Sequence, residues 1–264
     1  MASDAHYPKL KNQPLSLVLA EFRFSEIAKI SDYIPEIQER LRKQYPDFKK
    51  KLRHTIQLNE SGIVAAGGAA TLWTMVGAGR QKGIQIESGR LIYFCSAYDR
   101  FPGFQAKCME VIRVLIEVAA PGLLHRVGLR YNDLVLAAGN DVNAYLNPSW
   151  HMPAAMAKLG DPQLYRTETV VNTAVGVLAA RTLTGRHSYS IMPDILQLGL
   201  PITVSGDNNP DRLSVVLDFD HFWESESGVE FAADQAKDTL GALHEPAREA
   251  FWKTTTEEAK KRWS

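Results

Sequence analysis

The sequence predicts an α+β protein in which an extended antiparallel sheet carries long helices packed on one face. Two observations lead to this fold class. Two long stretches, 102–119 and 228–253, repeat apolar residues at three- and four-residue spacing, which is typical of amphipathic helices. Between them lie short apolar or alternating stretches separated by turn residues, and strands joined by such short turns run antiparallel.

The first half of the chain is expected to begin with a strand and to end with a long helix. A strand over 15–24 alternates charged and aromatic side chains towards its end. A helix follows from about residue 31, with Pro35 in its first turn, and ends at Tyr45-Pro46. The elements expected next are a hairpin over 54–66, a strand over 71–76, a hairpin over 83–97 and the helix over 102–119.

The second half is expected to follow a similar order. It begins with a strand over 125–136 and short helical stretches over 141–146 and 153–159. The strands expected next cover residues 164–172, 175–184, 187–191 and 195–204. A strand over 212–222 then leads into the last helix, where Pro246 predicts a kink because it removes one backbone donor.

This repeated order predicts two half-repeats, residues 1–122 and 123–264, that form one continuous structural unit. The residues of the two halves are not visibly similar, so the pattern is duplicated and the sequence is not. The order resembles that of the TATA-binding-protein-like saddle, in which two such halves make one curved sheet. That resemblance concerns the fold and implies no function.

Three short regions of the chain carry a resemblance to a family. They are PLSLVLAEFRF at 14–24, RVGLRYN at 126–132, and LHE at 243–245 followed by AFW at 250–252 and Trp263. Together they resemble a sporadically distributed family of uncharacterised prokaryotic proteins of about this length. The resemblance covers the whole chain and implies no catalytic residues. Its patchy distribution implies a mobile or defence-linked gene.

Composition predicts a globular, cytoplasmic protein. Of the 264 residues, 45% are hydrophobic and 23% are charged, and 30 basic residues balance 30 acidic ones. A net charge of zero argues against broad binding to nucleic acids or anionic membranes. No stretch has the roughly 20 apolar residues that a membrane-spanning helix needs. Two cysteines without a CxxC pattern, and a start without a basic or apolar leader, indicate a reducing cytoplasm.

The strand over 125–136 contains the polar residues that we interpret as a ligand- or partner-binding site. Arg126 and Arg130 share one face of this strand, and Tyr131 and Asn132 follow directly. Gly128 lies between the arginines and would let a ligand approach the backbone. Arginines so placed grip a carboxylate or phosphate. The alternative interpretation is that they pair with acidic residues within the sheet, namely Glu21, Glu168 or Asp218.

A basic run follows the first helix and suggests contact with nucleic-acid phosphates. It consists of Arg40, Arg42, Lys43, Lys49, Lys50, Lys51 and Arg53. Tyr45 and Phe48 within it would stack on bases. This hypothesis requires the run to gather with Arg126, Arg130 and other sheet arginines on one concave surface. The alternative interpretation is the solvated face of a helix and its following loop.

The densest group of metal-ligand residue types is Asp218, Asp220 and His221. The two carboxylates share a strand face and would suit a hard cation, although an exposed strand end with basic neighbours explains them as well. The glycine-rich segment at 77–83 lies between strands, whereas a phosphate-binding loop leads into a helix. Neither pattern predicts a cofactor, and no catalytic residue is assigned.

The sequence therefore predicts a non-enzymatic binding protein. Its expected partner is another protein, within a prokaryotic toxin–antitoxin or phage-defence system. The alternative is a nucleic-acid-binding protein that uses a concave sheet surface, and a further alternative is a metal-dependent hydrolase. A homodimer formed through an exposed edge strand is an additional hypothesis.

Overall fold

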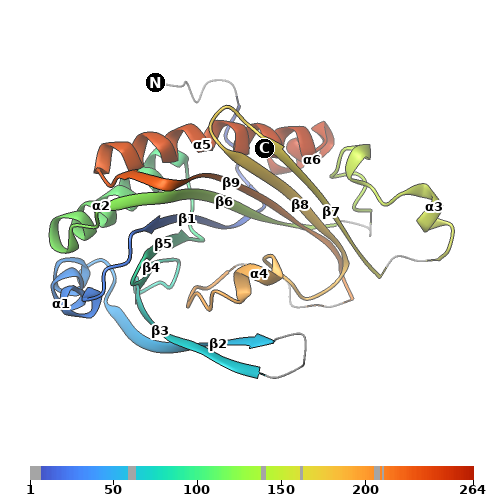
Figure 1. The fold of residues 1–264 in the computed structure, drawn as a ribbon. Helices are drawn as coiled ribbons and strands as arrows, with labels where there is room; N and C mark the ends of the chain where they lie inside the picture. The colour runs from blue at the N-terminus through green and yellow to red at the C-terminus, as the bar shows by residue number, and fades with distance from the viewer. Residues whose placement is uncertain (1–6, 59–63, 138–140, 161–162, 205–208, 210) are drawn as a thin grey trace.

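The computed structural model describes residues 7–58, 64–137, 141–160, 163–204, 209 and 211–264. Within this part of the chain, nine strands form one antiparallel sheet in the order β2-β3-β4-β5-β1-β6-β9-β8-β7 (Figure 1). Their bounds are β1 (Leu15–Phe24), β2 (Asp47–Leu58), β3 (Val64–Val76), β4 (Lys82–Glu87), β5 (Arg90–Cys95), β6 (Leu123–Leu136), β7 (Leu164–Asn172), β8 (Val177–Arg186) and β9 (Leu213–Glu230). The predicted α+β class is confirmed.

The long helices cover one face of this sheet, as expected (Figure 1). They are α1 (Ile30–Leu41), α2 (Phe101–Ala119) and α5 (Ala233–Thr254), and α6 (Glu257–Trp263) follows at the end of the chain. In α2 the apolar stripe that includes Cys108, Ile112 and Leu115 is fully buried, because it packs on the sheet and on α5. Helix α5 continues through Pro246, and Leu240 and Leu243 are likewise buried.

The opposite face of the sheet is covered by residues 187–204, where two strands were predicted. These strands are absent, and the segment contains the short helix α4 (Pro193–Leu196) instead. Ile191, Met192 and Ile195 of this segment form a second buried cluster with apolar side chains of β1, β5 and β9. Pro193 and Pro201 lack the backbone donor of a strand ladder, so the apolar side chains cover the sheet without extending it.

The backbone of this covering segment is held by the turn between β3 and β4 and by the residue that follows β5. The amide of Thr203 donates to the carbonyl of Arg80 at 2.8 Å, and the Ser96 hydroxyl donates to the carbonyl of Thr203 at 2.8 Å. Arg80 also donates to the carbonyl of Pro201 at 2.9 Å. The segment from the second half therefore bridges the sheet and ties the two halves together.

Several predicted boundaries change. The basic run does not form a loop, because residues from Asp47 onwards pair with β3 as the edge strand β2. The stretch 141–146 is a turn and not a helix, whereas a short helix α3 (Ala154–Ala157) lies within the predicted 153–159. A 3₁₀ turn, η2 (Pro148–Trp150), precedes it. The connection between β2 and β3 lies outside the described residues.

The sheet order places the two predicted half-repeats on either side of its centre. Strands β1 and β6 are neighbours, with β5, β4, β3 and β2 on one side and β9, β8 and β7 on the other. In each half a final strand leads to a long helix, α2 or α5. The duplication itself stays a prediction. No helix in the described part of the chain has the length and apolar character to span a membrane.

Candidate functional site

Strand β6 divides the four predicted binding residues between the two faces of the sheet. Successive side chains of a strand point in opposite directions. Tyr131 faces the long helices and bonds to His244 of α5, whereas Arg130 and Asn132 face the α4 segment. The structure therefore does not bring the four residues together in one site.

Arg130 lies in a network of ion pairs centred on the buried carboxylate of Asp218. Its Nε and Nη2 donate to the two carboxylate oxygens of Asp218 at 2.6 and 2.9 Å. Its Nη1 and Nη2 donate to Asp194 of α4 at 2.7 and 3.0 Å. Arg181 of β8 donates to Asp218 at 2.9 Å and to Glu168 at 2.6 Å. Burial opposes the charge of Arg130, but the carboxylates of Asp218 and Asp194 raise its pKa above the ordinary value.

This network leaves little capacity for an external anion. Four donor contacts of Arg130 already go to carboxylates, and a guanidinium has five N–H groups. Asn132 donates to the carbonyl of Leu217 at 3.1 Å and accepts from the amide of Met192 at 3.2 Å. Pairing within the sheet, the alternative interpretation of the arginines, describes this geometry. The network attaches the α4 segment to the sheet.

Arg126 lies further along the same face and is also paired. Its guanidinium contacts Glu224 at 3.0 Å and Glu21 at 3.3 Å and lies 3.6 Å from the ring centre of Phe222. A Cβ added at Gly128 would meet its nearest neighbours at 3.8 Å, an ordinary van der Waals separation. Within the described residues no backbone or side chain approaches this glycine closely, so the structure shows no close approach that would require a glycine here.

The three candidate metal ligands do not lie on the same face of the sheet either. Asp218 and Asp220 share the face of Arg181, which contacts them at 2.9 and 3.8 Å. His221 points to the helical face, where its Nδ1 lies 2.7 Å from the carbonyl of Leu243 and its Nε2 lies 2.9 Å from the Thr173 hydroxyl. Among the described residues, no group of three His, Cys, Asp or Glu side chains is placed to hold a metal ion.

The predicted basic run is spread over α1, the turn after it and β2. Arg40 pairs with Glu117 at 2.8 Å, and Arg42 pairs with Glu39 at 2.7 Å. Lys43 is exposed in the turn, and Lys49, Lys50 and Lys51 are exposed on the edge strand. The side chain of Arg53 lies outside those the structure describes. The arginines of the sheet, in contrast, lie in the paired networks above.

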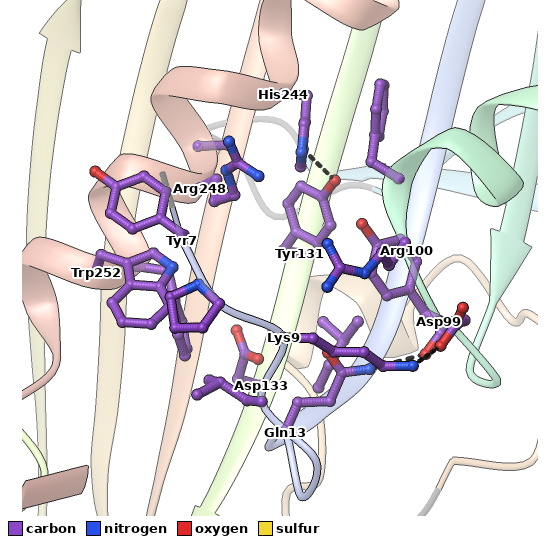
Figure 2. A pocket seen from close by; sticks show the side chains of 17 residues that line it. Tyr7, Lys9, Gln13, Asp99, Arg100, Tyr131, Asp133, His244, Arg248 and Trp252 are labelled. Carbon is purple, nitrogen blue, oxygen red and sulfur yellow. Dashed lines mark hydrogen bonds and ion pairs between the residues drawn. The ribbon is translucent and has the colours of Figure 1, made fainter. Parts of the chain in front are cut away.

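A pocket that the sequence did not reveal lies on the helical face of β6 (Figure 2). It encloses about 130 Å³ between the N-terminal segment, the residues after β5 and helix α5. Seven of its 17 lining residues are aromatic. Tyr7 stacks on Trp252 at 4.9 Å between ring centres, and Phe101 stacks on His244 at 4.0 Å. The ring of Tyr98 lies edge-on to that of Tyr131 at 5.9 Å.

Asp133 is the acidic residue buried in this pocket. Its relative exposure is 4%, and its backbone neighbours across the sheet are Leu15 and Leu217. No described residue donates a hydrogen bond to its carboxylate or forms an ion pair with it. Burial, with the nearby charge of Asp218, raises its pKa to about 8. The signal in the sequence was an aspartate in the apolar run of a strand, two positions from Tyr131 and on the same face.

The chain matches no protein-family model, and no curated protein matches its sequence.

Proposed function

We propose that this protein is a non-enzymatic binding protein that holds a protein partner along the outer edge of its sheet at β7. The observation that carries the proposal is the exposure of this edge. Leu164, Val170 and Val171 are 51%, 58% and 44% exposed, on both faces of the strand. An edge strand presents unpaired backbone donors and acceptors, and an extended segment of a partner adds to such an edge through main-chain hydrogen bonds.

The last four residues of β7 suit this mode of binding. Residues 169–172 read Thr-Val-Val-Asn, carry no charge and are all exposed. Their Thr and Val side chains favour extended backbone. Proteins that protect an edge place charges or proline there, and β7 carries its charges, Arg166 and Glu168, only in its first half. The proposed contact therefore centres on 169–172.

The polar clusters support binding rather than chemistry. Arg130, Arg181 and Asp218 satisfy one another and attach the α4 segment, so the densest group of charges has a structural role. The resemblance to a sporadically distributed prokaryotic family extends the proposal to a partner from a toxin–antitoxin or phage-defence system.

The test is co-purification from the native host with nuclease present. The wild-type protein is expected to retain a stoichiometric protein, and Val170→Lys is expected to lose it because a charge enters the contact. Leu52→Lys is the matched control, since it makes the same kind of change on the exposed residue of the opposite edge strand. Equal retention by the wild type and Val170→Lys would overturn the proposal. Light scattering shows whether the partner is a second copy.

A second candidate function, nucleic-acid binding, rests on the exposed edge strand β2. Lys49, Lys50 and Lys51 are exposed there beside Phe48, which offers a ring for base stacking. This surface is an edge of the sheet. The concave sheet surface that the sequence predicted for nucleic-acid binding is covered by residues 187–204. Binding of a labelled single strand should then fall steeply with salt and weaken in Lys50→Ala/Lys51→Ala. Binding that ignores both changes would remove this candidate.

A further inference from the structure

The pocket on the helical face of β6 has the dimensions of a site for a small molecule. Its volume of about 130 Å³ is close to that of cavities that hold a benzene ring, about 150 Å³. Strands β9 and β8 separate β6 from β7 in the sheet, so this site is distinct from the proposed partner edge. An experiment can therefore show loss of ligand binding in the pocket without loss of the protein partner at β7, and the reverse.

The feature that points to a ligand is the Asp133 carboxylate. It is 4% exposed, lines the pocket and has no hydrogen-bond or ion-pair partner among the described residues (Figure 2). An ionised carboxylate accepts up to about four hydrogen bonds, and buried acids in folded proteins are normally paired. Folding has already removed this group from water, so a cation that reaches it gains electrostatic attraction without further desolvation of the acid.

The walls of the pocket favour the same kind of ligand. The rings of Tyr98 and Tyr131 offer apolar surfaces, and aromatic faces attract cations. The ring of Trp252 is already stacked on Tyr7, and the Lys260 ammonium lies 5.0 Å from its centre. The charged and titratable groups that line the pocket with Asp133 are Tyr7, Lys9, Tyr98, Asp99, Arg100, Tyr131, His244 and Arg248. On the far face of the sheet, Asp218 also acts on Asp133.

The cations among these groups have other partners. Lys9 pairs with Asp99, and Arg248 contacts Glu245 at 2.7 Å. Arg100 also has an interaction partner. They therefore leave the Asp133 carboxylate as the acceptor for a ligand.

We propose that the pocket binds a small organic cation, an amine or amidine on a flat apolar body, whose N–H groups donate to the Asp133 carboxylate. An anion would face the buried acid, and a purely apolar molecule would leave the acid unpaired. The cation satisfies both the carboxylate and the aromatic walls.

Binding of such a cation is coupled to a proton. The pKa of Asp133 is about 8 in the protein alone, so at neutral pH the acid holds a proton that the cation must displace. The affinity should therefore rise by about tenfold per pH unit towards pH 8 and then level off. An amidinium keeps its charge over this range, so the change reports on the protein.

The test compares three probes of the same shape: benzamidine as the cation, benzamide as the neutral form and benzoate as the anion. Calorimetric titration of the full chain should show benzamidine binding most tightly, by about tenfold or more, because a hydrogen bond to a charged group is stronger than a neutral one. Benzoate or benzamide binding as tightly as benzamidine, or no binding by benzamidine at pH 8, would overturn the proposal.

Two variants locate the site. Asp133→Asn keeps the shape of the side chain, removes its charge and should weaken benzamidine binding by about tenfold or more. Asp99→Asn is the matched control, because it removes a carboxylate from the exposed rim of the same pocket and should leave the affinity within about threefold. Equal loss in both variants would contradict the assignment. If Asp133→Asn does not fold, the pH dependence of wild-type binding decides, and a flat profile between pH 6 and pH 8 overturns the proposal.

Discussion

Asp218 and Asp133 are two buried carboxylates on neighbouring strands, and they lie on opposite faces of the sheet. In the register of β6 with β9, Asp218 is opposite Asn132 and Asp133 is opposite Leu217. Asp218 accepts from Arg130 and Arg181 on the face covered by the α4 segment. Asp133 has no such partner within the described residues of the helical face.

The difference shows that burial alone does not decide what a carboxylate does. Both side chains are removed from water, with exposures of 0% and 4%. Asp218 has two guanidinium partners, and the cluster holds a covering segment in place. For Asp133 the cost of burial is met by binding a proton, as its raised pKa shows. The first arrangement stabilises the fold, and the second leaves an acid available to a ligand.

The largest expected effect comes from removing the shared partner of Asp218 and Asp194. Arg130→Ala should lower the free energy of unfolding by about 3–5 kcal/mol, because it leaves a buried carboxylate with incomplete pairing. Chemical denaturation at neutral pH measures this loss. Arg126→Ala is the matched control on the same strand and face. Its partner Glu224 is mostly exposed, and its other partner Glu21 keeps Arg23 and Arg90, so the loss should be about 1 kcal/mol. Equal losses of stability in the two variants would show that the Arg130 network stabilises the fold no more than the Arg126 pairs do.

A comparable effect, of opposite sign, is expected when the charge of Asp133 is removed. In the unfolded chain its pKa is about 4, and in the folded chain it is about 8. Between these values the folded state holds a proton that the unfolded state has lost. The contribution to stability is therefore greatest below pH 4 and is lost as the pH rises through 8.

Asp133→Asn should thus be more stable than the wild type at pH 8, by on the order of 5 kcal/mol, and close to it at pH 4. Denaturation of both proteins across this range measures the difference, in which other titrating groups cancel. Asp99→Asn should follow the wild-type profile above pH 4, because Lys9 lowers the pKa of Asp99. If the free energies of unfolding of Asp133→Asn and the wild type differed by the same amount at every pH, the raised pKa of Asp133 would be contradicted.

The smallest effect is expected at Gly128, on the Asp218 face of β6. A methyl group there would meet its neighbours at 3.8 Å, so Gly128→Ala should change stability by less than about 1 kcal/mol and in the stabilising direction. Gly83→Ala is the contrasting variant, because its Cβ would lie 2.8 Å from the carbonyl oxygen of Met75 and 2.6 Å from the Phe94 ring. Thermal unfolding should show a much larger loss of stability in Gly83→Ala than in Gly128→Ala. A large loss of stability in Gly128→Ala would instead indicate that a neighbouring group packs closely on the backbone at Gly128.

Local pattern was enough to predict the fold class and most of its elements. The spacing of apolar residues in α2 and α5, and the alternation in β1, depend only on neighbours along the chain, which set the period of a helix or strand. The same reasoning failed for residues 187–204. Their apolar residues suit a strand, but a segment that lies across a sheet face needs apolar residues too, and only the rest of the fold distinguishes the two.

The sequence by itself determined that Arg130 and Asn132 share one strand face, which follows from the two-residue period of a strand. The tertiary structure decided which groups meet there. Asp194 and Asp218 reach Arg130 from 64 and 88 residues away, while Asp133, three positions from Arg130, meets aromatic walls from both ends of the chain. Pairing of buried charges depends on contacts between distant segments, and local periodicity contains no information about those contacts.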